Sequence, residues 1–179
     1  MRKTLLFVLL LASFLFGEDV SESSIEMHAK VYPQILSFST NQKQKQLDTI
    51  LLEVVYSEDF ETEADSFRAF TDKYFGGVIR DKKLEVILIP ERAFSKSRSN
   101  VAGVYILSST GNSVNIIKEL NKKSVITFAG LPSALKNGTL FGLRLSDRVT
   151  ILLNKKTFQL GGYGFDSSLM RTVKIYESE

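Results

Sequence analysis

A short polar segment in the middle of the chain has residue types that could bind an anion. It follows the apolar run Val101–Leu107 and consists of Ser108, Ser109, Thr110 and Gly111. A helical pattern begins directly after it, and free backbone N–H groups at a helix start can hold an anion. The alternative interpretation is an ordinary strand-to-helix turn with good capping residues.

Two further candidates, Ser57 and Arg92, follow two other predicted strands. In an open parallel sheet, ligands bind beyond the carboxyl ends of the strands. The predicted ends lie at residues 56–57, 91–92, 108–111 and 129–130. Arg92 could add positive charge there, so Ser57 and Arg92 join the segment 108–111 as a candidate ligand site.

Residues suited to catalysis are scarce. The chain has one histidine, His28, and no cysteine, so thiol chemistry and thiolate metal sites are excluded. His28 lies near Met27 and Val31 on a predicted helix, where a lone histidine is more often structural than a ligand. No nucleophile elbow, zinc-protease motif or phosphate-binding loop occurs. We therefore expect no catalytic residue, no metal and no cofactor, and a carboxylate-only hydrolase is the remaining enzymatic alternative.

Two patterns resemble sites but have simpler interpretations. The glycine-rich segment 162–167 approaches a dinucleotide fingerprint, but it follows a predicted helix instead of a first strand. The acidic residues of segment 58–65 could bind a cation. They also fall at a helix start, where the helix dipole favours negative charge.

The first residues have the layout of a secretory signal peptide. Arg2 and Lys3 precede an apolar run from Leu5, and Gly17 precedes an acidic pair. We expect cleavage after Gly17, with an uncleaved anchor as the alternative, and a single domain over residues 18–179. Loss of the leader takes two of the 23 Lys and Arg residues, which leaves 21 against 20 acidic residues. The mature chain is then close to neutral, so nucleic acid is not expected as a partner. No second apolar run of membrane length occurs after the leader, so stable membrane insertion of the mature chain is not expected.

The elements that must position these residues alternate between strand and helix. Strands are expected at Thr49–Tyr56, 84–89, Val101–Leu107 and 125–128. Helices are expected at 57–75 and 112–122, after a first helix capped by Ser23 and kinked or broken at Pro33. This alternation predicts an α/β fold: a mostly parallel sheet with helices on both faces.

The last third has a different pattern. Residues 140–145 and 149–153 are joined by a turn too short for a parallel crossover, so a C-terminal antiparallel hairpin is expected. A short helix at 154–160 and a final helix from Asp166 or Ser167 to about Tyr176 complete the prediction.

The C-terminal third also resembles the YfiR-like family of periplasmic regulatory proteins. The resemblance rests on three segments: 138–145 leading into 148–154, Phe158 with 165–170, and the central strand with its serine-containing exit at 104–109. The first helix, residues 25–38, lies where the family begins. Ala102 stands where a family cysteine often precedes the central strand, so redox control is not expected here.

The resemblance implies a function. Such proteins bind and restrain the periplasmic sensor region of a membrane diguanylate cyclase, which lowers cyclic di-GMP signalling and biofilm formation, and they can form homodimers. For that role an exposed apolar patch is expected, with Phe94, Tyr163 and Phe165 as candidate partner-binding residues. The alternative is a periplasmic small-ligand binding domain that serves a sensor or a transporter.

Overall fold

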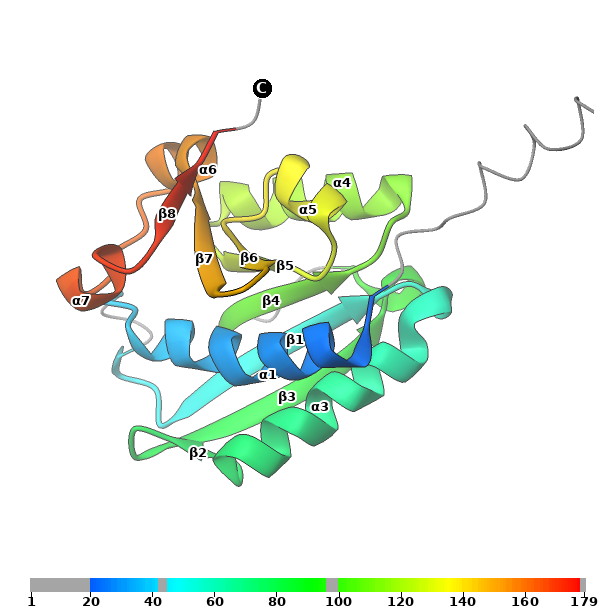
Figure 1. Ribbon diagram of the computed structural model, residues 1–179, viewed down its shortest axis with the longest axis horizontal. Helices are drawn as coiled ribbons and strands as arrows, with labels where there is room; N and C mark the ends of the chain where they lie inside the picture. Colours follow the sequence, from blue (N-terminus) through cyan, green and yellow to red (C-terminus); the bar gives the residue numbers. More distant parts are fainter. Residues whose placement is uncertain (1–19, 42–44, 96–99, 178–179) are drawn as a thin grey trace, which may run out of the picture.

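The computed structural model describes residues 20–41, 45–95 and 100–177, which form one eight-stranded sheet with helices on both faces (Figure 1). The predicted fold class is therefore confirmed. The predicted leader, residues 1–17, lies outside the described residues. Within those residues, every helix is too short or too polar to span a bilayer.

The strands follow the order β2-β3-β1-β4-β5-β6-β7-β8 across the sheet. Their bounds are β1 Thr49–Tyr56, β2 Val78–Ile79, β3 Lys82–Pro90, β4 Val101–Leu107, β5 Ile126–Ala129, β6 Phe141–Leu145, β7 Val149–Asn154 and β8 Lys174–Tyr176. Strands β3, β1, β4, β5 and β6 are parallel, and β6 and β7 form the predicted antiparallel hairpin.

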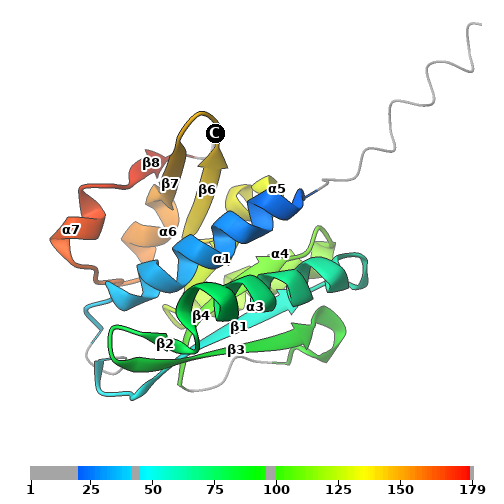
Figure 2. The same cartoon turned by 60° about the horizontal axis from the view of Figure 1, so that its bottom comes forward.

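The helices form two layers, one on each face of the sheet (Figure 2). Their bounds are α1 Glu22–Ser37, α3 Glu61–Phe75, α4 Gly111–Lys122, α5 Pro132–Lys136, α6 Lys155–Leu160 and α7 Ser167–Met170, with short 3-10 turns at Glu58–Phe60 and Glu91–Ala93. Helices α1 and α3 cover one face, where Tyr32 and Phe67 are fully buried. Helices α4 and α5 cover the other face through Ile117 and Leu135.

Strand β1 shows how the sequence gives this layering. Its side chains alternate between the two cores, with Leu52 and Val54 on the α1/α3 side and Leu51 and Val55 on the α4 side. Because both faces are covered, almost the whole strand is buried and reads as a continuous apolar run. The chain crosses from β1 to β3 through α3 and from β4 to β5 through α4, on opposite faces.

The ends of helix α3 follow from local chemistry. Acidic Glu61 and Glu63 lie in its first turn, where they complement the helix dipole. Gly76 ends the helix in the left-handed conformation with φ 55°, and its N–H donates to the Asp72 carbonyl.

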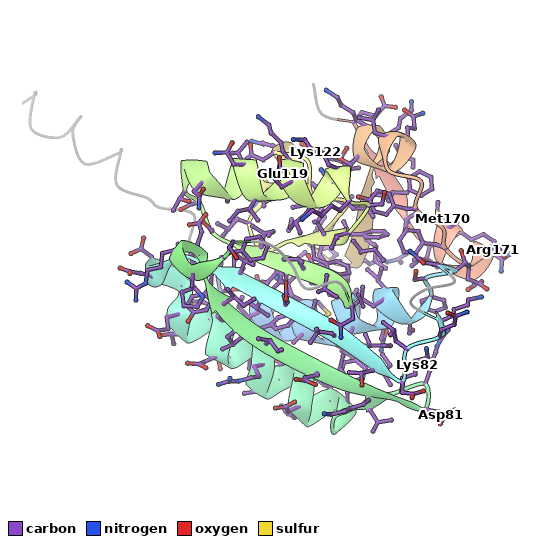
Figure 3. The ribbon with its side chains drawn as sticks, turned by 180° about the vertical axis from the view of Figure 1, so that it is seen from behind. Asp81, Lys82, Glu119, Lys122, Met170 and Arg171 are labelled. Carbon is purple, nitrogen blue, oxygen red and sulfur yellow. The ribbon has the colours of Figure 1, made fainter. Side chains whose placement is uncertain are left out.

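Charged side chains line the outer surfaces. Glu119 and Lys122 pair on the exposed side of α4, and Asp81 lies at the tip of the β2–β3 hairpin (Figure 3). Arg80 and Asp81 both have positive φ, as a tight two-residue hairpin turn requires.

Several predicted elements were wrong in detail. Helix α1 is capped by Ser21 instead of Ser23, and it continues through Pro33 without a break. Tyr32, Ile35 and Leu36 are buried on both sides of the proline, so packing holds the last turn in place.

The predicted final helix stops at Met170. The chain then forms β8, which pairs in parallel with β7, so the sheet extends one strand beyond the hairpin. The hairpin strand β2 and the short helix α5 were not predicted from the sequence, because two and five residues carry too little periodicity.

Candidate functional site

The carboxyl ends of β1 and β4 hold most of the sequence-predicted ligand residues, and a buried carboxylate already occupies the centre of this group. The Ser108 hydroxyl donates to Glu91 Oε2 at 3.1 Å. The Thr110 hydroxyl lies 2.7 Å from both carboxylate oxygens of Glu91. Glu91 is 8% exposed and lies in the 3-10 turn after β3. Its carboxylate contacts Thr110, the N-cap residue of α4, and negative charge is favoured at such a helix start. The chain therefore supplies its own anion to the predicted anion site.

The other predicted ligand residues at this end are not brought into one group. The Ser57 hydroxyl is buried and has no hydrogen-bond partner among the described residues. Arg92 forms an ion pair with Glu58, and both side chains are exposed. Ser109 and Gly111 are exposed beside Thr110.

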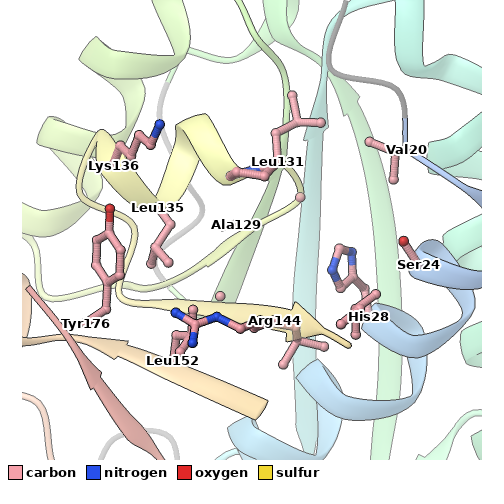
Figure 4. A pocket seen from close by; sticks show the side chains of 15 residues that line it. Val20, Ser24, His28, Ala129, Leu131, Leu135, Lys136, Arg144, Leu152 and Tyr176 are labelled. Atoms are coloured by element: carbon pink, nitrogen blue, oxygen red, sulfur yellow. The ribbon is translucent and has the colours of Figure 1, made fainter. Parts of the chain in front are cut away.

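A cavity of about 390 Å³ opens at the carboxyl end of the next strand, β5 (Figure 4). Ala129, Gly130 and Leu131 form one part of its wall and the N-terminal end of α1 a second, and α5 with β6, β7 and β8 forms the rest. A volume of this size suits a small organic molecule. The strand end at 129–130 was among the four predicted from the sequence, but no side chain there marked it as a site.

The cavity exists because β5 and β6 separate after a single paired position, Phe128 and Phe141. The Tyr32 hydroxyl lies between the two strands and donates to the Ala129 carbonyl at 2.6 Å. It also accepts a hydrogen bond from the Leu143 backbone. The Tyr32 hydroxyl thus replaces a direct backbone hydrogen bond between β5 and β6, and the two strands diverge beyond it.

Gly130 keeps the exit of β5 close to its neighbour β4. Its N–H donates to the Ile106 carbonyl at 2.8 Å. An added Cβ at this position would lie 2.7 Å from the same carbonyl oxygen, which no side chain tolerates without a backbone shift. The cavity wall therefore consists of bare backbone at this point.

His28 lines the cavity and is only 5% exposed, and burial lowers its pKa to about 4. Its imidazole is therefore neutral near pH 7. The Tyr105 hydroxyl lies 2.9 Å from His28 Nδ1, and burial raises the pKa of Tyr105, so the hydroxyl keeps its proton. Among the described residues this hydroxyl has no other hydrogen-bond partner, so it donates to Nδ1. The remaining nitrogen, Nε2, then carries the imidazole hydrogen and acts as a donor in the cavity wall.

Aromatic stacking fixes the orientation of this histidine. The His28 ring stacks on Tyr32, one helical turn away, with ring centroids 5.0 Å apart. Tyr32 in turn stacks on Phe128 of β5. The His28 donor and the Tyr32 hydroxyl that lies between β5 and β6 are therefore both positioned by the same face of α1.

Two cations lie at the opposite side of the cavity from His28 and Ser24 (Figure 4). Arg144 comes from β6 and Lys136 from the end of α5, and neither forms an ion pair with another described residue. The described residues that line the cavity include no aspartate and no glutamate. The cavity is thus apolar in its walls and positive at one side.

The three predicted partner-binding residues are all half-buried. Phe94 packs against the core on the α4 side, and Tyr163 and Phe165 pack against the core on the α1 side. The Tyr163 hydroxyl donates to the Val125 carbonyl at 3.3 Å. More exposed apolar side chains occur elsewhere, including Leu145 and Val149 on the β6–β7 hairpin. A partner-binding role for Phe94, Tyr163 and Phe165 stays a prediction.

Sequence reasoning missed Lys136, Arg144 and the use of His28. Arg144 did carry a signal, because a charged residue interrupts the apolar run of segment 140–145 on the face shared with Gly142. His28 and Tyr32 are spaced as neighbours on one helix face, but the divergence of β5 from β6 cannot be derived from that spacing.

Comparison with known proteins places the fold but not the family. No model of a known protein family matches the chain, and no curated protein matches it. One similar solved structure is a conserved domain protein from Vibrio cholerae O1 biovar El Tor strain N16961. It is 13% identical with a TM-score of 0.57, and the match covers 84% of this chain and 59% of that one.

Another similar structure is described as the ABC domain in complex with L-Trp from Streptococcus pneumoniae. It is 11% identical with a TM-score of 0.52, and the match covers 86% of this chain and 60% of that one. The chain thus spans about three fifths of the length of both structures. At these identities the likeness shows a shared α/β fold only.

Proposed function

We propose that this protein is a non-catalytic binding domain whose small-molecule ligand occupies the cavity between β5, β6, α1 and α5. The observation that carries the proposal is the separation of β5 and β6 at Tyr32, which leaves about 390 Å³ of open space lined by apolar side chains and a few convergent donors. One buried donor, His28, belongs to this lining.

Two further observations favour binding over catalysis. The imidazole of His28 is held neutral, and its inner nitrogen is engaged by Tyr105. The described lining offers no carboxylate or thiol to act with it as nucleophile or base. The similarly folded domain from Streptococcus pneumoniae, in complex with L-Trp, gives an example of a small molecule bound on such a fold.

The test is a ligand-observed NMR screen of a small-molecule fragment library against three proteins. Ser24 lies half-buried in the first turn of α1 and lines the cavity, so Ser24→Trp fills the space without touching the core. Ser23 is exposed and does not line the cavity, which makes Ser23→Trp the matched control. We expect fragments that bind the wild type and Ser23→Trp but not Ser24→Trp. Binding that survives Ser24→Trp unchanged would refute the assignment.

A second role, restraint of a membrane-bound diguanylate cyclase by contact with its periplasmic sensor region, is favoured by one surface feature. Leu145 and Val149 are cross-strand partners at the tip of the β6–β7 hairpin and are 40% and 43% exposed. Leu145 also lines the cavity. A partner bound to this hairpin would therefore lie at the rim of the ligand site.

This second role can be tested by chemical crosslinking in membranes from the source cells. The double variant Leu145→Ser/Val149→Ser removes the apolar pair, and Leu160→Ser removes an apolar side chain that is 80% exposed elsewhere. We expect a diguanylate cyclase to be crosslinked by the wild type and by Leu160→Ser and lost with the double variant. Recovery of no membrane cyclase with the wild type counts against the role.

A further inference from the structure

We propose that the ligand of this cavity is a small organic acid with an apolar body, whose anionic group faces Arg144 and Lys136. This inference rests on the proposed binding function and names the chemical class of its ligand. It follows from the signs of the charges around the cavity, the apolar wall between them and the donor at the far side.

Arg144 and Lys136 are both exposed cations at the cavity, and the protein leaves them available to an anionic ligand. Arg144 and Lys136 form no ion pair with another described residue, whereas Lys122 and Lys155 pair with Glu119 and Glu177. The contrast with Glu91 is informative, because there the chain itself places a carboxylate among the donors. At the β5 end the equivalent carboxylate is missing from the lining, so a bound ligand can supply it. An arginine binds a carboxylate through two parallel hydrogen bonds.

The surroundings strengthen the positive field at this end of the molecule. The hairpin β6–β7 and strand β8 together contribute Arg144, Arg148 and Lys174, and their only acidic residue is Asp147. A surface of one predominant charge raises the local concentration and the association rate of ligands of opposite charge.

The space between the cations and His28 suits an apolar body. Leu131, Leu135 and Leu152 line it (Figure 4). Burial of apolar ligand surface against such side chains supplies affinity that a free inorganic anion could not gain. His28 Nε2–H lies on the α1 side and can donate to an acceptor atom of the ligand.

Three probes of matched shape separate the ligand classes: 3-phenylpropanoate, 3-phenylpropan-1-ol and 3-phenylpropylamine. They share one apolar body and carry a negative charge, no charge and a positive charge. Calorimetry gives the affinities, and NMR of the imidazole gives the location, since the chain has a single histidine. We expect the propanoate to bind about tenfold more tightly than the alcohol, as one charge-assisted hydrogen-bonded contact allows. We expect the amine to bind most weakly and the His28 signal to shift with the propanoate.

Arg144→Gln removes the charge, and Arg148→Gln removes a charge from the same hairpin outside the cavity lining. We expect Arg144→Gln to weaken propanoate binding about tenfold and to leave alcohol binding within about twofold. Arg148→Gln should change both affinities by less than about twofold.

The outcomes distinguish the two proposals. Equal binding of the acid and the alcohol, or tighter binding of the amine, overturns the ligand class while the binding function stands. Propanoate binding that leaves the His28 signal unmoved places the acid outside the cavity and overturns the inference. Failure of all three probes, together with failure of the fragment screen, removes the binding function itself.

Discussion

The carboxyl ends of β4 and β5 are neighbours in one sheet, yet one is closed and the other open. Beyond β4, the hydroxyls of Ser108 and Thr110 donate hydrogen bonds to the Glu91 carboxylate. Beyond β5, Arg144 and Lys136 face a cavity with no carboxylate among its described lining residues. Polar residues at a strand end therefore do not by themselves mark a ligand site. The proposed site rests instead on donors that make no hydrogen bond with another described residue and that lie next to open space.

The largest expected difference between the two ends is a pH dependence of the free energy of unfolding that comes from His28, at the open end. Burial lowers its pKa from 6.5 to about 4, so between these values the unfolded chain binds a proton that the folded chain does not. The stabilising contribution is complete above pH 6.5 and is lost as the pH falls towards 4, on the order of 3 kcal/mol in total.

This effect is measured as the difference between wild type and His28→Gln in urea unfolding from pH 7.5 to 4. His28 faces Tyr105 of β4, Tyr32 of its own helix, and the cavity with Arg144, Lys136 and Tyr176. The difference isolates the histidine from carboxylates that titrate in the same range. A wild-type stability that falls no more steeply than that of His28→Gln would contradict the burial of a neutral imidazole.

Glu91→Ala tests whether the closed end is a structural unit. The change removes the shared acceptor of two hydroxyls, and we expect a loss of about 2 kcal/mol in the free energy of unfolding, since Ser108 and Thr110 can still bond each other. Calorimetry of this variant with acetate should at the same time detect binding if the vacated position is a true anion site. A loss below about 0.5 kcal/mol would show that the carboxylate is dispensable.

Tyr32→Phe tests the role of the Tyr32 hydroxyl between β5 and β6. The Ala129 carbonyl and the Leu143 backbone lose their shared partner, and both residues line the cavity. We expect a loss of about 1 kcal/mol in thermal or urea unfolding, with the cavity still able to bind probes. Loss of probe binding at unchanged stability would mean that the hydroxyl contacts the ligand.

The smallest effect is expected for Arg92, the cation of the closed end. Its ion pair with Glu58 is exposed on both sides, at 77% and 74%, and solvent screens it. Arg92→Ala should change the free energy of unfolding by less than about 0.5 kcal/mol and leave 3-phenylpropanoate binding unchanged. A marked loss of binding would move the site back to the β1/β4 end.

The sequence predicted most of the fold because the alternating apolar runs are long. The strand Thr49–Tyr56 is recognised by its continuous apolar run and the helix Glu61–Phe75 by its helical periodicity, and Gly76 marks a helix end by its chemistry alone. Strand β8 was missed because the helix predicted to begin near Asp166 was expected to continue to about Tyr176. Asp166 does cap a helix, but this helix, α7, has only four residues, and the three residues of β8 follow it. Tertiary pairing with β7 then outweighed the local pattern.

The candidate site was harder to predict, for a physical reason. Ser108 to Gly111 have the composition of an anion site, but composition does not show that Glu91 fills it. The cavity depends on Tyr32 reaching the gap between β5 and β6, a contact between residues about a hundred positions apart. Only the packed structure reveals such long-range geometry.

A single NMR titration tests the central claim most directly. The untagged protein, labelled with ¹⁵N, is titrated with 3-phenylpropanoate while the His28 imidazole and the backbone amides of Gly130 and Gly142 report on the open end and that of Gly111 on the closed end. The account predicts saturating shifts of His28, Gly130 and Gly142 with a stationary Gly111. Shifts centred on Gly111 while His28 stays unmoved would contradict it.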